Sequence, residues 1–527
     1  MEFLNRLVRA IEHEWAVFME TVRSAAFREV LLWCVPALAL GFIARALLTI
    51  HFPYGYFQED SADFLVTAER FTRHHGLVIH GKKAFLAPIL FTIPFLLHVP
   101  ALIAIPVAQH LGGLAATVAT GLIVRCWFRL WRWFIVPITI LYTLNPALLW
   151  FEHALLAEAL CLFSLTGLAL AGTLLVRRAT LRRFVWLIVA LFFTAGSRPE
   201  GKLFVVFGLG VTALVTMGDW KIWIRRMAVM LVCAAAIWMS SRSTQAGLLL
   251  YGTVLPMAPD TSAVAPGVEP FIQPIRAATV STARTKYNSV ERQANEALKQ
   301  YLKSLGKPSG DRNINALAQK LALEAVRRRP LTLPILAADK FLITCRPEPD
   351  GTYMDTSGGY DSYWIYDKQR DALERRNFMK ALMPGLTGRA LDDNAAIEAF
   401  LKQEYQPMSP DWFTPLQKAW SKLTLGFQWG SHGADKRFIP GWPALCVVAA
   451  VGMLVSLIPR DRLWRFHLPW AGTLMGVWFA VMLTGIVLPR YRFVFEPFFL
   501  IYAMLAMDYI LGSVLRRSET AGVIGQH

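Results

Sequence analysis

Long apolar segments recur along this chain, and short clusters of Lys and Arg separate them. Runs such as 31–50 and 493–515 are long enough to cross the hydrocarbon core of a bilayer as helices. We predict ten spans, near 30–50, 101–124, 134–151, 156–176, 184–197, 202–217, 227–241, 438–458, 468–488 and 493–515. Because 184–197 and 227–241 are short for a bilayer, ten is an approximate number. The pattern therefore predicts an all-α polytopic membrane protein.

The positions of the basic residues predict how these spans are oriented. The 527 residues are 55% hydrophobic and only 17% charged, yet the net charge is +17. The clusters of Lys and Arg lie in short connections, at 6–28, 125–132, 177–183, 221–226, 460–465 and 516–517. With ten spans, every cluster faces the cytoplasm, as the positive-inside rule requires, and both chain ends lie there. The positive charge then needs no nucleic acid as a partner, because the cytoplasmic connections lie beside anionic membrane lipids.

This topology divides the chain into three parts. Residues 1–241 form a transmembrane module with a first outer loop at 51–100, residues 242–437 form an extracytoplasmic domain, and residues 438–527 form the C-terminal transmembrane helices. Stretches such as YNSVERQANEALKQYLKSLG predict that the extracytoplasmic domain is mostly helical.

The first outer loop contains a second apolar stretch, 84–99. Pro88 and Pro94 interrupt it, and counting it as a span would place every later basic cluster outside. We therefore predict a re-entrant or interfacial element on the outer face.

Acidic and basic side chains gather at the predicted outer ends of several spans. They are Glu59, Asp60, Lys82, Lys83, His153, Glu158, Arg198, Glu200, Lys202, Arg490 and Arg492. Ionisable groups beside a bilayer are costly, so a cluster of them on one face indicates a site. Cations would neutralise the phosphate of a lipid carrier at this depth, and a carboxylate would accept the proton of an attacking hydroxyl.

The order of these stretches resembles that of the GT-C superfamily of polyprenyl-phosphate-sugar-dependent glycosyltransferases. The similarity is greatest to the branch of protein mannosyltransferases and lipid A aminoarabinose transferases. It covers about 30–220 and 485–500, and it is carried by EDSADFLVTAERF, HGKKAFLAPIL, NPALLWFEHALLAEAL, SRPEG and RYRFVFEP. The chain departs from the family pattern where Glu59 precedes the Asp and where Phe64 replaces a common Tyr.

The resemblance implies a role for each matching residue. Asp60 would be the catalytic base, and Glu158 a second acid that positions the sugar or the acceptor. The residues implied to bind substrate, with the carrier phosphate on the cations, are Glu59, Lys82, Lys83, His153, Arg198, Arg490 and Arg492. The implied reaction is an inverting transfer from a polyprenyl-phosphate donor to a lipid, glycan or protein acceptor, with no cofactor and no metal indicated. It would take place on the extracytoplasmic face, and the charge pattern favours a bacterial inner membrane.

Simpler interpretations stay open beside the catalytic one. Asp60 or Ser61 could cap the helix that follows, His153 could be a structural hydrogen-bond partner, and Arg198 could be only a counterion for Glu158. A transporter or flippase for a lipid-linked sugar would also place arginines outside, but it should show polar or broken helices within the bilayer. A polysaccharide polymerase or ligase would rely on a large outer loop with paired arginines instead of Asp60.

Overall fold

The computed structural model is helical throughout the part of the chain that it describes. That part comprises residues 24–57, 59–72, 84–240, 246–255, 261–282, 287–331, 333–338, 381–382, 442–459, 461–484 and 493–524, with short pieces between 410 and 419. Within these residues the backbone forms no strand, and the one isolated bridge pairs Tyr56 with Ala154 in parallel. The prediction of an all-α fold is confirmed.

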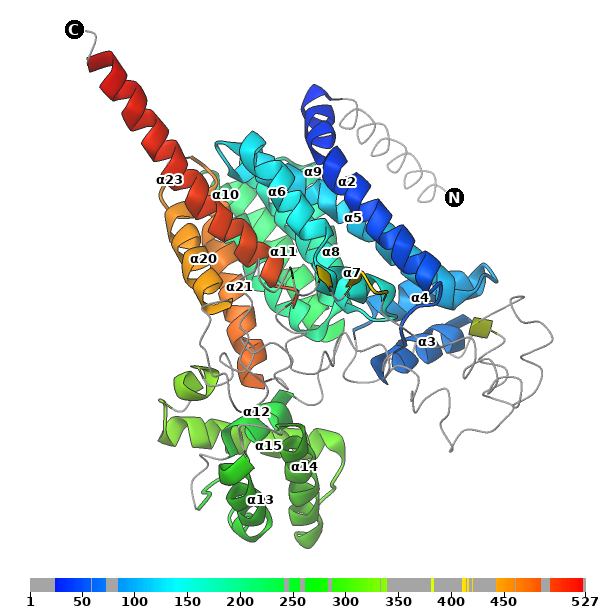
Figure 1. The fold of residues 1–527 in the computed structure, drawn as a ribbon. Coiled ribbons are helices and arrows are strands. Elements are labelled where there is room, and N and C mark those ends of the chain that lie inside the picture. The colour runs from blue at the N-terminus through cyan, green and yellow to red at the C-terminus, as the bar shows by residue number, and fades with distance from the viewer. Residues whose placement is uncertain are drawn as a thin grey trace, which may run out of the picture.

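The apolar helices pack side by side as a bundle (Figure 1). They are α2 (Ala25–His51), α5 (Ala101–Trp127), α6 (Trp131–Thr143), α7 (Pro146–His153), α8 (Glu158–Arg177), α9 (Leu181–Ser197), α10 (Val205–Thr216), α11 (Trp220–Ser240), α20 (Trp442–Ser456), α21 (Trp464–Thr484) and α23 (Glu496–Ile524). Six helices of the described chain are long and apolar enough to cross a membrane, and α6 with α7 makes a seventh candidate. The chain is thus a polytopic membrane protein by the length and composition of its helices.

The predicted span at 134–151 differs from the structure, which breaks it into α6 and α7 with a bend of 45°. Asn145 caps α7, because its side chain accepts hydrogen bonds from the N–H groups of Ala147 and Leu148. Pro146 follows at the first helical position, where a missing N–H costs nothing, and it disfavours helical geometry in the residue before it. This dipeptide therefore ends one helix and starts the next inside an apolar segment.

Two short helices of the first outer loop lie at one end of the bundle (Figure 1). They are α3 (Glu59–Thr72) and α4 (Leu86–Leu96), and they pack together with Phe64 edge-on to Phe91 at 6.2 Å between ring centroids. At 11 residues, α4 is too short to cross a bilayer, and its interfacial or re-entrant position stays a prediction.

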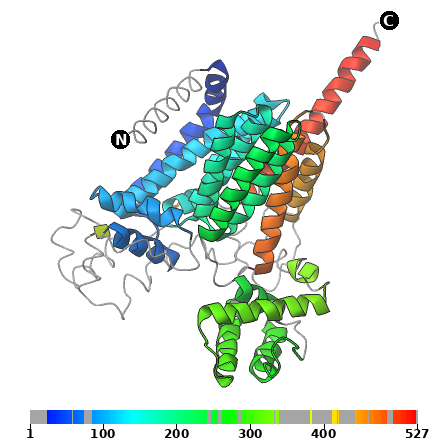
Figure 2. The same ribbon diagram turned by 180° about the vertical axis from the view of Figure 1, so that it is seen from behind.

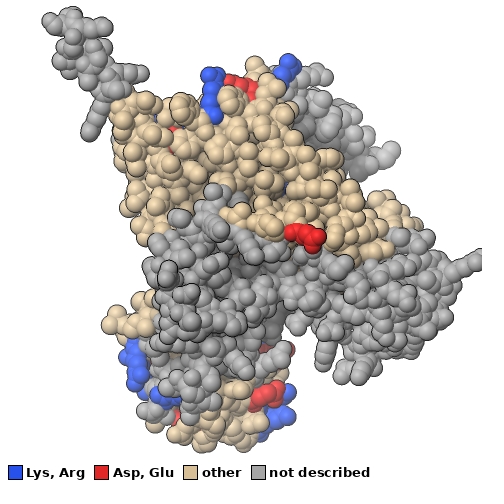
Figure 3. All heavy atoms as spheres, viewed as in Figure 1, with Lys and Arg blue, Asp and Glu red and all other residues tan. Residues whose placement is uncertain are grey.

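The basic connections meet at the other end of the bundle. Arg177 donates to the carbonyl oxygen of Cys126 at 2.7 Å, and Arg226 donates to that of Ala179 at 3.0 Å. These bonds join the connections at 125–132, 177–183 and 220–226, as the predicted orientation requires. In the view of Figure 3, Lys, Arg, Asp and Glu side chains lie on this upper rim, and the bundle surface below it is mostly tan, with a few Asp or Glu atoms.

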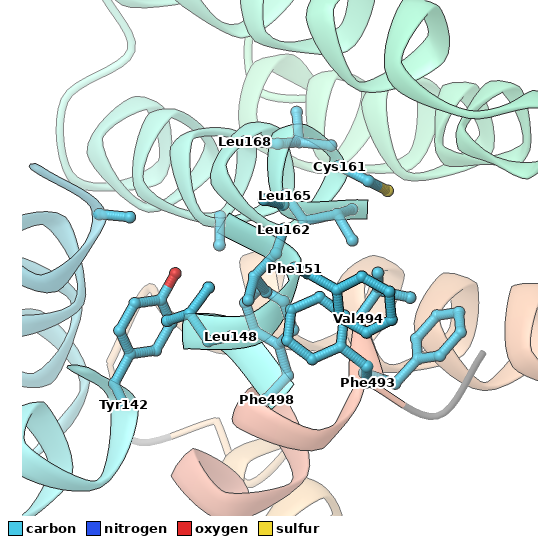
Figure 4. Packing of buried hydrophobic residues seen from close by; sticks show 14 of the residues in the cluster. Tyr142, Leu148, Phe151, Cys161, Leu162, Leu165, Leu168, Phe493, Val494 and Phe498 are labelled. Atoms are coloured by element: carbon cyan, nitrogen blue, oxygen red, sulfur yellow. The ribbon is translucent and has the colours of Figure 1, made fainter. Parts of the chain in front are cut away.

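The core of the bundle is apolar and aromatic where α7, α8 and the start of α23 meet (Figure 4). Phe493, just before α23, packs on Phe151 of α7 at 4.7 Å between ring centroids. Farther along, a Cβ on Gly452 of α20 would collide with the carbonyl oxygen of Tyr502, so α20 and α23 touch backbone to backbone. The last helices are therefore part of the same core as the first ones.

A separate helical lobe lies beyond the end of α21 in both views (Figures 1 and 2), at the end of the bundle that carries α3. It contains α12 (Ala246–Val254), α13 (Glu269–Thr282), α14 (Tyr287–Ser304) and α15 (Asp311–Arg328), which enclose a hydrophobic core of their own. The described residues of this lobe are mostly helical, and its place as an extracytoplasmic domain stays a prediction. The remainder of 242–437 lies outside the described residues, apart from short pieces.

Candidate functional site

An acid and a base from two neighbouring helices meet at the end of the bundle opposite the basic connections. Glu158 is the first residue of α8, and Arg198 follows the last residue of α9. Arg198 Nη1 lies 3.1 Å from Glu158 Oε1, and Arg198 Nε donates to Glu200 Oε1 at 2.5 Å. Glu158 and Arg198 are only 5% and 8% exposed, so this charge pair is largely removed from solvent. The structure thus joins two of the residues that the sequence predicted for the site.

The local sequence explains why Arg198 lies at this position. Pro199 ends α9 and begins a short 3-10 helix, η1 (Pro199–Phe204). A Cβ on Gly201 would collide with the carbonyl oxygen of Thr194, so η1 folds back onto the last turn of α9 only because residue 201 is glycine. The same turn packs Lys202 into the bundle, so that only 7% of this residue is exposed. A second cation therefore lies four residues from Arg198.

The first outer segment, residues 52–57, is hydrogen-bonded to the end of α7. The Tyr56 N–H donates to the carbonyl oxygen of His153 at 2.9 Å, and the Leu155 N–H donates to that of Tyr56 at 3.0 Å. The Gly55 N–H donates to the carbonyl oxygen of Leu102, at the start of α5, at 2.7 Å. The segment is therefore fixed to two helices of the bundle.

This bridge determines where two acid-bearing helices begin. Helix α3 begins at Glu59, three residues after Tyr56, and α8 begins at Glu158, four residues after Ala154. Since each of these links is at most roughly 14 Å long when fully extended, both helices begin near the bridge. Asp60 lies in the first turn of α3, where a carboxylate is favoured by the helix dipole. The side chains of Glu59 and Asp60 lie outside the described residues.

His153 is enclosed completely, with none of its surface exposed. Its Nε2 lies 2.9 Å from the carbonyl oxygen of Phe52, and its Nδ1 lies 3.0 Å from Nε2 of His110. Its ring also contacts the ring of Tyr56 at 4.7 Å between centroids. This enclosure favours the structural interpretation of His153 over direct contact with a substrate.

A buried network that sequence reasoning missed adjoins His153. It consists of Arg45, His110, Glu152 and His153, and each is at most 5% exposed. Arg45 makes a two-bond pair with Glu152, with Nε and Nη2 at 2.7 and 2.8 Å from the two carboxylate oxygens. His110 Nδ1 lies 3.0 Å from the same carboxylate. The signal in the sequence was a lone arginine inside an apolar span, because such a charge needs a buried partner.

Two glycines make room for this ion pair. A Cβ on Gly113 of α5 would collide with Glu152 Oε1, and one on Gly41 of α2 would collide with Thr143 Oγ1. Arg45 Nη1 uses the space beside Gly41 to donate to the oxygens of Gly41 and Thr143 at 2.9 and 3.2 Å. The guanidinium therefore donates hydrogen bonds to Glu152, Gly41 and Thr143, and the two glycines leave the space that these contacts need.

The remaining predicted residues lie where the structure is not described. Lys82, Lys83, Arg490 and Arg492 are all outside the described residues. The first described residue after them, Phe493, contacts Phe151 of α7. The predicted convergence of Arg490 and Arg492 on the outer end stays a prediction.

Comparison with known proteins adds no relative. No protein-family model matches the chain, and no curated protein matches it. Among the described residues, His, Cys, Asp and Glu form no group of three or more that could hold a metal ion. The chemistry of the site therefore has to be inferred from its own residues.

Proposed function

We propose that this chain is an integral membrane glycosyltransferase of the GT-C type. It would move a sugar from a polyprenyl-phosphate carrier to a hydroxyl or amine of a lipid, glycan or protein on the extracytoplasmic face. The observation that carries the proposal is the pairing of Glu158 with Arg198 at the end of the bundle away from the basic connections. The bridge between Tyr56 and Ala154 links the starts of α3 and α8 at that end.

The proposed reaction assigns one step to each kind of group. The acceptor oxygen or nitrogen attacks the anomeric carbon, the bond from that carbon to the carrier phosphate breaks, and the configuration inverts. The Asp60 carboxylate accepts the acceptor's proton, and the bond electrons leave with polyprenyl phosphate. Arg198, with Lys82, Lys83 and Arg490, neutralises the charge that develops on the phosphate. Glu158 positions the sugar or the acceptor.

The exposure of the two carboxylates beside Arg198 indicates how a phosphate would enter. The Glu200 side chain is 19% exposed, whereas that of Glu158 is 6% exposed. A carrier phosphate that reaches this surface would therefore compete with Glu200 for the guanidinium and leave the pair with Glu158 in place. Arginine suits this exchange because its planar fork of donors binds carboxylate and phosphate in the same geometry.

A turnover assay tests the proposal. The intact protein in lipid nanodiscs is mixed with a panel of polyprenyl-phosphate sugars and membrane extract as the source of acceptors, and released polyprenyl phosphate is measured. We expect turnover by the native chain and a loss of at least about 100-fold in Asp60→Asn, since a general base contributes that much or more. The matched control is Asp63→Asn, one turn further along α3, which should retain turnover.

Two outcomes of this assay would contradict the proposal. Full turnover in Asp60→Asn would remove the base assignment and turn attention to Glu158. No release of polyprenyl phosphate from any donor would remove the transferase itself.

A transporter of lipid-linked sugar is the second candidate, and two observations favour it. The span formed by α6 and α7 is broken, and a charged network is buried inside the bundle. Both features occur in transporters, where they form substrate or ion pathways. Movement of a fluorescent donor lipid between leaflets of proteoliposomes, without release of polyprenyl phosphate, would favour this function over the transferase.

A further inference from the structure

A chain of three hydrogen bonds runs from the Glu152 carboxylate to the backbone of the first outer segment. The links are Glu152 to His110 Nδ1 at 3.0 Å, His110 Nε2 to His153 Nδ1 at 3.0 Å, and His153 Nε2 to the Phe52 carbonyl oxygen at 2.9 Å. The two ends of this chain are oxygen acceptors, and only the two imidazole rings between them can supply hydrogens.

The number of hydrogens in this chain fixes its charge. Each of the three bonds needs one N–H, whereas two neutral imidazole rings carry only two between them. The three bonds therefore need one proton more than two neutral rings hold, so one of the rings carries a hydrogen on both nitrogens. That ring is His110, because its Nδ1 faces the Glu152 carboxylate, whereas His153 faces the neutral carbonyl of Phe52. His110 then donates from Nε2 to His153 Nδ1, and His153 donates from Nε2 to Phe52.

We propose that His110 is an imidazolium buried in the bundle, and that its proton holds residues 52–57 against α7. With this proton in place, all three bonds form and the Phe52 carbonyl is tied to the ion pair of Arg45 and Glu152. Removal of the proton leaves one of the three bonds unmade, so that residues 52–57 are held to the bundle by the backbone hydrogen bonds of Gly55, Tyr56 and Leu155 without the full histidine chain. Residues 52–57 lead into α3, so their weaker attachment would affect the segment that carries Glu59 and Asp60. The effect on Glu59 and Asp60 rests on the proposed function, whereas the protonation of His110 does not depend on it.

The Glu152 carboxylate beside His110 favours retention of the proton, whereas the positive charge of Arg45 opposes it. From α7 it meets the Glu152 carboxylate and the His153 ring, and from α2 the Arg45 guanidinium lies on the far side of that carboxylate. Helix α8 places Phe163 beside the neighbouring Gly112, and α4 contains no ionisable residue. Other ionisable side chains near the network, among the described residues, are the phenols of Tyr54, which contacts Phe52, Tyr56, which contacts His153, and Tyr142, which bonds Thr166.

A protonated Glu152 would satisfy the same chain with two neutral rings, but the geometry opposes it. Both oxygens of Glu152 accept from Arg45 at 2.7 and 2.8 Å, which are distances typical of a guanidinium on an ionised carboxylate. A proton on either oxygen would make that oxygen a donor, and it would then face an N–H donor of Arg45.

The proton can be observed directly by ¹⁵N NMR of the intact protein in nanodiscs with labelled histidine. The chain has 11 histidines, so His110→Gln and His153→Gln assign the two rings by loss of signal. We expect the His110 ring of the native protein to carry two N–H groups at neutral pH and to lose one as the pH is raised, whereas the His153 ring stays neutral. Two neutral rings throughout the pH range in which the protein stays folded would overturn the proposal.

Hydrogen exchange tests the coupling to the first outer segment. At one fixed pH of 7.5, the amides of Gly55 and Tyr56 should exchange roughly tenfold faster in His110→Gln than in the native protein, as expected for the loss of one hydrogen bond. Amides inside α8 are the internal control and should be unchanged. In the native protein, exchange at 52–57 relative to α8 should rise in the same pH range in which His110 loses its proton. Equal exchange at 52–57 on both sides of that range would overturn the coupling, and neither measurement depends on turnover.

Discussion

Replacing Arg45 with Met is expected to lower the stability of the bundle by about 3–5 kcal/mol, because it leaves the carboxylate of Glu152 buried without its main partner. Glu152 has no exposed surface, and Arg45 supplies two of the three short contacts that its oxygens make. The measurement is the midpoint of thermal unfolding of the detergent-solubilised protein, followed by size-exclusion chromatography with tryptophan fluorescence.

The double variant Arg45→Met with Glu152→Leu is the matched control. Replacing both partners of a buried ion pair with apolar residues is often close to neutral, so this variant should recover most of the lost stability. A single variant as stable as the native protein would show that the Arg45 and Glu152 pair does not hold α2 to α7.

Replacing Arg198 with Gln is expected to lower turnover by roughly 100- to 1,000-fold, the range found when one group that stabilises developing charge is removed. Arg198 contacts the predicted acid Glu158 and the neighbouring Glu200. The measurement is release of polyprenyl phosphate at saturating donor, so that a loss in kcat is separated from weaker donor binding.

Two further variants separate chemistry from folding in this experiment. Arg198→Lys retains the positive charge that balances Glu158 but lacks the planar fork of donors, so it should fold and still lose part of the turnover. Arg178→Gln removes an exposed arginine at the opposite end of the bundle and should have native turnover. Native turnover in folded Arg198→Gln would make Arg198 only a structural counterion for Glu158.

The architecture of the bundle was predictable because it depends on local composition. Apolar length located the helices of the bundle, and the basic clusters predicted which helix ends share a side. Of the ten predicted spans, six correspond to helices of the described chain that are long and apolar enough to cross a membrane, and α6 with α7 makes a seventh. Since α8 and α9 run in opposite directions, a prediction that 177–183 lies at one end also puts Glu158 and Arg198 at the other. The salt bridge between them shows that both residues lie at the same end of the bundle, and that this end is the outer one stays a prediction.

The buried network was not predictable in the same way, because its members are distant in the sequence. Arg45 and Glu152 are 107 residues apart, and their contact depends on the space that Gly41 leaves beside Thr143 and that Gly113 leaves beside Glu152. Hydropathy averaged over a window treats Arg45 as one tolerated charge in an apolar span and does not indicate its partner. The break between α6 and α7 was hidden by the same averaging, although Asn145 and Pro146 are a recognisable start for a helix.

The most direct test of the central claim is to label the carrier-binding site. A polyprenyl phosphate that has a photoreactive diazirine beside its phosphate is incorporated into nanodiscs with the intact protein. The sample is irradiated, and the labelled peptides are identified by mass spectrometry. The proposed site predicts labels in α3, in the segment leading into α8 and in η1, all reduced by excess unlabelled carrier. Labels confined to the opposite end, at 125–132 and 177–183, would contradict it.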